Sequence, residues 1–170
     1  RPTFLCLSKG ITSGYLPLSA TLTTDEIYSA FYGERSKLFI HSHSYSANPL
    51  ACAVANETLH LLTEDNFLET LKPKIAAIKE YGKLFDGIEG EFRQTGMIAA
   101  MELVKNKKER FSPEKRVGYQ IYLEGLKRGL FLRPLADVVY FIPPLVITED
   151  EIEIMLTTAR DCINTVLKRP

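Results

Sequence analysis

The sequence lacks an excess of charge of either sign, and it has no tryptophan and no long apolar run. It holds 21 basic and 21 acidic residues among 170, so its formal net charge is zero. A chain without a basic excess offers little attraction to nucleic acid or to an anionic membrane surface. None of its apolar stretches reaches the roughly 20 residues that a transmembrane helix needs. These absences predict a protein without nucleic-acid or membrane partners.

Cysteine is also scarce. Cys6, Cys52 and Cys162 are odd in number and far apart. Their spacing matches neither a metal site nor a disulfide framework, and it suits a reducing compartment. We therefore expect a cytoplasmic protein without a bound metal. Its content of 45% hydrophobic and 25% charged residues is typical of a globular protein.

A lysine stands where a short apolar run ends. The run from Phe4 to Leu7 predicts a buried strand, although its length also fits a buried helix. It ends at Ser8-Lys9-Gly10, and ligands of open α/β sheets bind at such strand ends. A partly desolvated lysine has a lowered pKa and can form a Schiff base. From spacing alone, a solvated Lys9 is the commoner case, because most lysines are exposed.

Three segments resemble the class III (ω-type) aminotransferases, which use pyridoxal 5′-phosphate. Residues 7–24 (LSKGITSGYLPLSATLTT) resemble the segment around the cofactor lysine of that family. Residues 41–53 (HSHSYSANPLACA) resemble its phosphate-contacting loop and the helix that follows. Residues 129–147 (GLFLRPLADVVYFIPPLVI) resemble its substrate-carboxylate segment. The segments occur in the family's order, and the first is most similar to the branch that aminates 8-amino-7-oxononanoate in biotin biosynthesis.

The resemblance implies an α/β protein with the PLP-dependent transferase fold type I. Residues 1–60 would be the C-terminal part of the large cofactor domain, and residues 61–170 the small C-terminal α+β domain. Enzymes of the family are far longer, and several of their cofactor-binding groups precede the cofactor lysine by a long way. These are the aspartate at the pyridine nitrogen, the ring-stacking aromatic residue and the glycine-rich phosphate turn. We therefore expect this chain to be an incomplete fragment that is inactive alone.

The resemblance also assigns site residues near the N-terminus. Lys9 would bind pyridoxal 5′-phosphate as a Schiff base, and its freed neutral amine would then move a proton. Ser44 would contact the cofactor phosphate from the partner subunit of a homodimer, with His43 contributing its backbone. Ser42 would contact the substrate. Surface or interface side chains are the competing interpretation of His41 and His43.

Two further residues belong to the third segment. Arg133 lies in an apolar run, where an unpaired charge is costly. It therefore predicts either a structural salt bridge or bidentate binding of a substrate carboxylate, which is the role of the matching family arginine. Tyr140 matches a tyrosine near the far end of the substrate, and strand packing is its equal alternative.

The remaining pattern predicts a small sheet with helices on one face. Apolar spacing, caps and turn residues predict a short helix from Thr23–Glu26, helices over 49–63, 67–85 and 113–128, and a final helix from a capping box at Thr148. Strands are expected near 16–22, over 97–104, and over 131–135 and 138–142 with a tight turn between these two, while 88–92 fits a loop or a short strand.

Three functions remain open on the sequence. The leading one is transfer of an amino group to 8-amino-7-oxononanoate, giving 7,8-diaminononanoate, with S-adenosylmethionine as the usual donor and lysine in some relatives. The second is another class III aminotransferase that acts on ornithine, 4-aminobutyrate or a diamine. The third is a non-catalytic piece that only dimerises. Arg133-Pro134 followed by Tyr140 to Pro144 favours the first.

Overall fold

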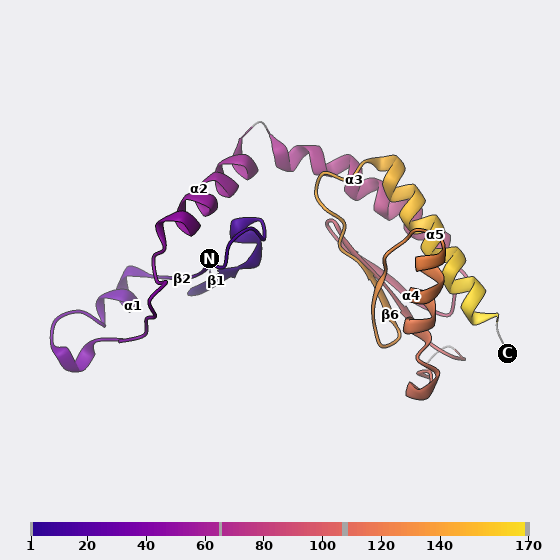
Figure 1. Cartoon of the computed structure of the whole chain (residues 1–170), viewed down its shortest axis with the longest axis horizontal. Coiled ribbons are helices and arrows are strands. Elements are labelled where there is room, and N and C mark those ends of the chain that lie inside the picture. The colour runs from indigo at the N-terminus through magenta and orange to yellow at the C-terminus, as the bar shows by residue number, and fades with distance from the viewer. Residues whose placement is uncertain (1, 65, 107–108, 169–170) are drawn as a thin grey trace. The chain divides into compact units, whose positions relative to one another are not determined.

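A computed structural model describes residues 2–64, 66–106 and 109–168. The chain divides into two compact units (Figure 1). Unit 1 ends at Leu68 and unit 2 begins at Glu69. The boundary expected at residue 60 falls inside helix α2 (Pro49–Thr63), three residues before its end. Within the described ranges, none of the helices combines the length and the apolar character that crossing a membrane requires.

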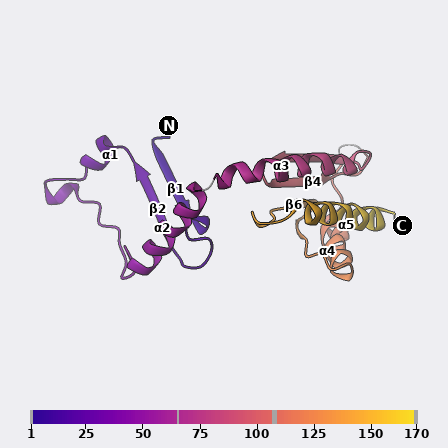
Figure 2. The ribbon, with the colours of Figure 1, turned by 90° about the horizontal axis from the view of Figure 1, so that it is seen from above.

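Unit 1 contains one two-stranded sheet, several short helices and one long helix, with α2 beside the turn that follows β1 (Figure 2). In chain order its elements are β1 (Phe4–Ser8), η1 (Lys9–Thr12), β2 (Ser19–Thr23), α1 (Asp25–Ser29), η2 (Arg35–Lys37) and α2 (Pro49–Thr63).

The strand that precedes Lys9 is present, but its predicted burial is wrong. β1 pairs with β2 in antiparallel register, from Phe4 opposite Thr23 to Ser8 opposite Ser19. Within the part of the chain that the structure describes, β2 is the only strand paired with β1. Phe4 is 56% exposed, because two strands without a covering layer cannot bury either face.

The two helix starts expected in unit 1 are confirmed. The Thr24 hydroxyl accepts a hydrogen bond from the backbone N–H of Ile27 and caps α1. The Asn48 side chain accepts hydrogen bonds from the N–H groups of Leu50 and Ala51, and Pro49 occupies the first turn of α2. Local chemistry therefore fixes where both helices begin.

The buried face of α2 consists of small residues rather than large apolar ones. Leu50 is 71% exposed, and the buried residues are Ala51, Ala55 and Thr58. Thr58 is hydrogen-bonded to Ser13 after η1, so α2 turns its small residues toward this part of unit 1.

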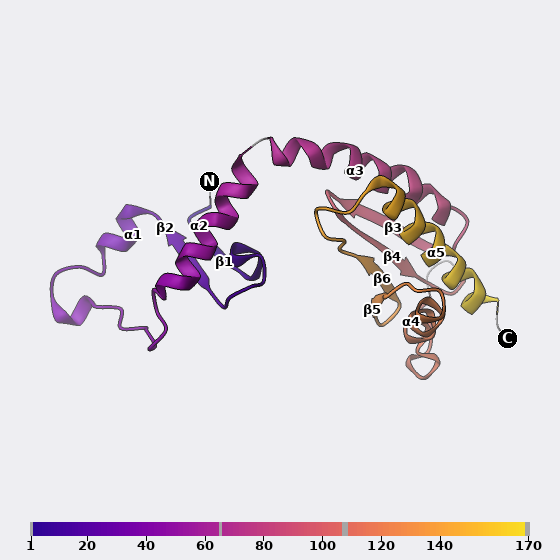
Figure 3. The same cartoon turned by 45° about the horizontal axis from the view of Figure 1, so that its top comes forward.

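Unit 2 is a four-stranded antiparallel sheet packed with helices (Figure 3). The strand order is β3-β4-β6-β5. Its elements are α3 (Phe67–Gly82, which starts in unit 1), η3 (Lys83–Phe85), β3 (Gly90–Thr95), β4 (Ile98–Leu103), η4 (Pro113–Lys115), α4 (Val117–Lys127), β5 (Arg133–Leu135), β6 (Val138–Phe141) and α5 (Glu149–Leu167).

Helices cover one face of this sheet, as predicted. Phe85 stacks on Phe92 of β3 with ring centroids 5.1 Å apart. At the other edge, a Cβ atom added to Gly118 of α4 would lie 2.8 Å from the Cβ atom of Pro134 in β5. Both sheet residues belong to one row of cross-strand partners that faces the helices: Phe92, Met101, Val139 and Pro134.

The neighbouring row of partners lies on the opposite face, because successive side chains of a strand alternate between faces. It runs across the four strands through Arg93, Ala100, Tyr140 and Arg133. Two of the residues expected to bind substrate are therefore direct neighbours on the face away from the helices. The turn expected at Ala136 and Asp137 brings them together, and Ala136 adopts a left-handed φ of 50° there.

The start predicted for the helix over 113–128 is wrong. Pro113 begins the short helix η4, and the α-helix begins only at Val117. Arg116 lies between them with a left-handed φ of 45°, which interrupts the helical path. A serine followed by proline marks a helix start without specifying its type. The segment 88–92, expected to be a loop or a short strand, overlaps β3, which runs from Gly90 to Thr95.

The capping box at the start of α5 is confirmed. The Thr148 hydroxyl accepts from the N–H of Glu151, and the Glu151 carboxylate accepts from the N–H of Thr148 at 2.8 Å. The Thr148 bonds to that carboxylate hold the pKa of Glu151 below its usual value, the backbone bond being the larger cause. The buried face of α5 contains Ile152, Leu156, Ala159, Cys162, Ile163 and Val166.

Candidate functional site

The Lys9 groove is an open depression of about 1150 Å³ in unit 1. We use this name for the surface lined by the end of β1, the segment from Gly14 to Ser19, and the loop before α2. Lys9, Ser42 and His43 all line it. The structure thus brings together three of the four residues that the sequence assigned to cofactor and substrate contacts near the N-terminus.

Lys9 occupies the first position of η1, directly after β1. Its backbone has a left-handed φ of 51°, a region that residues other than glycine rarely adopt. The side chain is exposed, and within residues 2–64, 66–106 and 109–168 its amine makes neither a hydrogen bond nor an ion pair. The described residues therefore leave the amine free toward the groove without supplying the desolvation that the sequence argument invoked.

The loop before α2 is held by its own hydrogen bonds. The backbone N–H of His43 donates to the Ser46 hydroxyl at 3.1 Å, and the His43 carbonyl accepts from the Ser46 N–H at 2.9 Å. The Nδ1 atom of His43 accepts from the N–H of Tyr45 at 3.1 Å. Both backbone groups of His43 are thus engaged in the turn, which leaves the outer ring nitrogen, Nε2, as its remaining polar group.

Ser44 belongs to the same loop but is not among the residues that line the Lys9 groove. Its side chain is exposed, and in the described part of the chain its hydroxyl has no hydrogen-bond partner. Ser44 thus follows Ser42 and His43 directly in the loop without lining the groove that they line.

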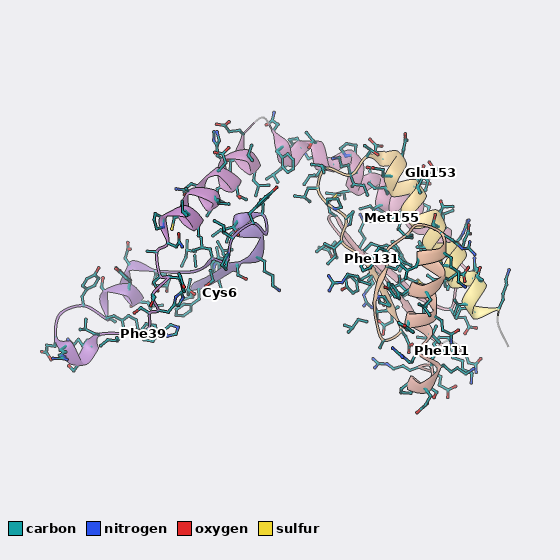
Figure 4. All side chains as sticks on the ribbon, in the orientation of Figure 1. Cys6, Phe39, Phe111, Phe131, Glu153 and Met155 are labelled. Atoms are coloured by element: carbon teal, nitrogen blue, oxygen red, sulfur yellow. The ribbon has the colours of Figure 1, made fainter. Side chains whose placement is uncertain are left out.

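The Arg133 groove is a second depression, of about 680 Å³, in unit 2. Arg133 and Tyr140, which are direct cross-strand partners, both line it. Its other lining residues are mostly apolar, and they include Phe131 and Met155, labelled in Figure 4. The charged and polar side chains in this mainly apolar groove are the Arg133 cation, the Tyr140 phenol and the Glu151 carboxylate, which is already bonded to Thr148. The cation, free of ion pairs in the described residues, suits a chain-like molecule with one carboxylate in these apolar surroundings.

The structure corrects the physical premise for Arg133. Its position in an apolar run predicted a costly charge that needs a partner, but Arg133 begins β5 and is exposed. Among the described residues it forms no salt bridge, so the structural ion pair that competed with carboxylate binding is not formed there. A guanidinium in solvent has no burial cost to offset, and its donors stay free.

Sequence reasoning missed two kinds of residue, aromatic side chains that line the Lys9 groove and a buried threonine in the turn beside it. Tyr15 and Phe39 line it with exposed rings, and Phe39 is labelled in Figure 4. Thr12 is completely buried although it is polar, and it lies three residues after Lys9. An aromatic residue in a loop and a threonine in a glycine-rich turn give no signal that separates them from ordinary loop residues.

Comparison with known proteins agrees with this geometry. The family model for aminotransferase class III matches residues 1–163. An adenosylmethionine-8-amino-7-oxononanoate aminotransferase of Aquifex aeolicus is 45% identical over 173 residues, covering 98% of this chain and 38% of the relative. A putrescine–pyruvate aminotransferase of Pseudomonas aeruginosa is 38% identical over 168 residues, covering 96% and 36%.

A solved structure shows the same fold. The crystal structure of adenosylmethionine-8-amino-7-oxononanoate aminotransferase from Methanocaldococcus jannaschii matches with a TM-score of 0.92 at 40% identity, covering 97% of this chain and 39% of that one. The chain therefore spans less than two fifths of the length of these relatives. Because the family model covers nearly the whole chain and the structural match agrees with it, the chain belongs to the class III aminotransferase family.

Proposed function

We propose that this chain is part of an aminotransferase that transfers an amino group to 8-amino-7-oxononanoate, with S-adenosylmethionine as donor. The observation that carries the proposal is Lys9. It directly follows strand β1, lines an open groove with Ser42 and His43, and keeps its amine free of partners in the described residues. The similarity to the Aquifex aeolicus relative supports the choice of substrate.

Pyridoxal 5′-phosphate is the cofactor that we propose for the Lys9 groove. The donor set fits it: the primary amine of Lys9 suits an aldehyde, and the Nε2 atom of His43, whose backbone groups are already engaged in the turn, suits an anionic phosphate. The volume of about 1150 Å³ also leaves room for a substrate. When bound, this cofactor supplies an aldehyde for amines and an electron sink for the charge that develops on the substrate carbon.

Lys9 would first bind the cofactor covalently and then carry a proton at its Nζ atom. Only an amine that can be neutral serves both purposes, and an arginine at this position would stay protonated. Lys9 has a left-handed backbone at the end of β1 that borders the groove, so its side chain begins there. Both roles of Lys9 depend on where its Nζ atom lies in the groove.

Arg133 would bind the carboxylate of 8-amino-7-oxononanoate through two parallel N–H donors of its guanidinium. Its freedom from other partners in the described residues, and its apolar surroundings in the Arg133 groove, support this role. Tyr140, its cross-strand partner, would contact the same end of the substrate.

A homodimer would account for Ser44. Its exposed hydroxyl points to no partner within the described chain and does not line the Lys9 groove. We propose that it serves the cofactor phosphate of the neighbouring subunit. The matching position of the family has this role, and a hydroxyl donor suits a phosphate oxygen.

A diamine is the second substrate class that an observation favours. The similarity to the putrescine–pyruvate aminotransferase of Pseudomonas aeruginosa extends over 96% of the chain. A diamine itself has no carboxylate for Arg133 to bind, although the pyruvate that accepts its amino group has one, whereas 8-amino-7-oxononanoate carries its own carboxylate. Comparing both substrates in one protein therefore separates the two functions.

The experiment uses a chimera in which this chain replaces the matching segment of the Aquifex aeolicus relative. We expect the chimera to form 7,8-diaminononanoate, and we expect Lys9→Ala to lose all measurable transamination because no other amine takes its place. Borohydride reduction with pyridoxal 5′-phosphate, followed by peptide mass mapping, should attach the cofactor to Lys9. Lys37→Ala is the matched control, since Lys37 is also exposed but lies outside the groove. Turnover by Lys9→Ala close to that of the unmodified chimera would refute the proposal.

A further inference from the structure

The turn that carries Lys9 is built from backbone conformations that are unusual for its residues. Lys9 and Ser13 both have left-handed φ values, 51° and 50°, and Gly14 follows with 81°. Only the last of these is a glycine, for which the region is unstrained. Residues with side chains keep a left-handed backbone only where surrounding contacts hold it. The contacts that hold this turn therefore also hold the backbone of Lys9.

Thr12 holds the inside of the turn. It is completely buried, and its hydroxyl donates to the Leu16 carbonyl, with the Lys9 carbonyl as a second, more distant acceptor at 3.4 Å. The Gly14 N–H also donates to the Lys9 carbonyl at 3.3 Å. The Thr12 proton is thus committed mainly to Leu16 and closes the turn, while the Gly14 N–H holds the peptide that leaves Lys9, so the turn restrains the backbone at Lys9.

Thr58 fastens the outside of the turn to α2. Its hydroxyl donates to the Val54 carbonyl at 2.9 Å, so its single proton is committed there. The Ser13 hydroxyl, 3.2 Å away, must therefore be the donor in the bond between the two side chains. Thr58 is only 6% exposed, and the helix that carries it begins directly after the loop of Ser42 and His43.

We propose that Thr12 and Thr58 are positioning residues for Lys9. Thr12 closes the turn that begins at Lys9 by its bond to the Leu16 carbonyl, and Thr58, through Ser13, fixes that turn against the helix whose N-terminal loop lines the same groove. Together they determine where the amine of Lys9 stands relative to Ser42 and His43. This inference rests on the proposed function, because it concerns the residue that would bind the cofactor.

The test replaces each hydroxyl by a methyl group of similar size. Thr58→Val removes the acceptor for Ser13, and Thr63→Val is its matched control. Thr63 makes the same kind of helical bond, to the Leu59 carbonyl at 2.8 Å, but no bond to the turn is present for it in the described residues. Thr12→Val is compared with Thr12→Ser, which keeps the hydroxyl.

Two readouts are measured. The first is hydrogen exchange of the Ser13 and Gly14 amides in this 170-residue chain, followed by NMR. The second is the ratio of pyridoxal 5′-phosphate fixed by borohydride on Lys9 to that fixed on Lys37, measured in the chimera. We expect Thr12→Val and Thr58→Val to speed exchange about fivefold and to lower the labelling ratio by a similar factor, the size of one lost hydrogen bond. Thr12→Ser and Thr63→Val should stay within about twofold of the parent.

The outcomes separate this inference from the function beneath it. If Lys9 of the parent chimera is labelled no better than Lys37, the proposed function fails and the inference with it. If Lys9 is labelled selectively and the two valine variants lower thermal stability without changing the labelling ratio, the threonines are only structural and the inference alone is overturned. A loss that is equal in Thr12→Ser and Thr12→Val would also overturn it, because the hydroxyl would then be irrelevant.

Discussion

Replacing Arg133 by alanine should weaken substrate use without weakening the fold. Arg133 is exposed at the start of β5 and lines the Arg133 groove beside Tyr140. Among the described residues it has no ion-pair partner, so its removal leaves no opposite charge behind. We therefore expect the free energy of unfolding to change by less than about 0.5 kcal/mol, as for other surface substitutions.

The kinetic effect follows from the lost carboxylate contact. Truncating one partner of a hydrogen-bonded charge pair costs about 2 to 5 kcal/mol when the pair is buried. The lower end applies here, because Arg133 is open to solvent and solvent screens its charge. A loss of about 2 kcal/mol lowers kcat/KM for 8-amino-7-oxononanoate about 30-fold. Arg133→Lys should recover only part of this, since an ammonium lacks the planar fork of a guanidinium.

The assay is steady-state kinetics of the chimera with 8-amino-7-oxononanoate, together with urea unfolding of this chain. Arg93→Ala is the matched control. Arg93 lies at the other end of the same cross-strand row, but it is paired with Glu102 and Glu91 and does not line the groove. It should leave kcat/KM within about twofold of the parent, the range expected of a charge remote from the substrate.

Two results would refute the reasoning about Arg133. One is an unfolded Arg133→Ala protein whose folded fraction keeps the parental kcat/KM, which would make the arginine structural. The other is an equal loss of kcat/KM in Arg93→Ala, which would mean that the general positive charge of this sheet face matters rather than the Arg133 fork. The half-reaction with a diamine alone, measured without a keto-acid acceptor, should show no dependence on Arg133 in either case.

Two further predictions concern the subunit interface and the stability of α5. If Ser44→Ala alone abolishes most activity, mixing a Lys9→Ala chimera with a Ser44→Ala chimera should restore activity. The reason is that a heterodimer then has one intact site and one doubly altered site. No gain in activity after proven subunit exchange would count against a shared site. Thr148→Ala should destabilise unit 2 by about 1 kcal/mol, measured by urea unfolding, because it removes the N-cap of α5. Because the pKa of Glu151 is lowered in the folded state, its carboxylate stabilises the fold at pH values above the ordinary glutamate pKa, and this stabilisation is lost as the pH falls through the lowered pKa. Thr148→Ala should therefore flatten the pH dependence of the free energy of unfolding in that acidic range. An unchanged acid profile would show that Glu151 gains nothing from the capping box.

Local sequence determined most helix and strand positions. Asn48 before Pro49, and Thr148 three residues before Glu151, each start a helix where expected, because a cap bonds to backbone groups within three residues of itself. The turn at Ala136 follows the same logic, since it joins two short apolar runs. The error at Pro113 arose where the local signal fits two kinds of helix and the left-handed Arg116 decided between them.

The sequence by itself also determined the family, through three motifs in order, and it named Lys9, Ser42, His43, Ser44, Arg133 and Tyr140 as candidates. Their joint placement was decided only by the tertiary structure, which puts Lys9, Ser42 and His43 on one groove, Arg133 and Tyr140 on another, and Ser44 on neither.

Burial and pairing were likewise decided by the tertiary structure. Leu50 is exposed and Thr12 is buried, the reverse of what their side chains suggest, because burial depends on which distant element packs against a residue. Arg133 lies in an apolar run of the sequence, but its side chain is exposed in the structure. It lies on the face of the sheet that the helices do not cover. Hydrogen-bonding caps act over a few residues and can be read from the chain, whereas a groove needs segments that only folding brings together.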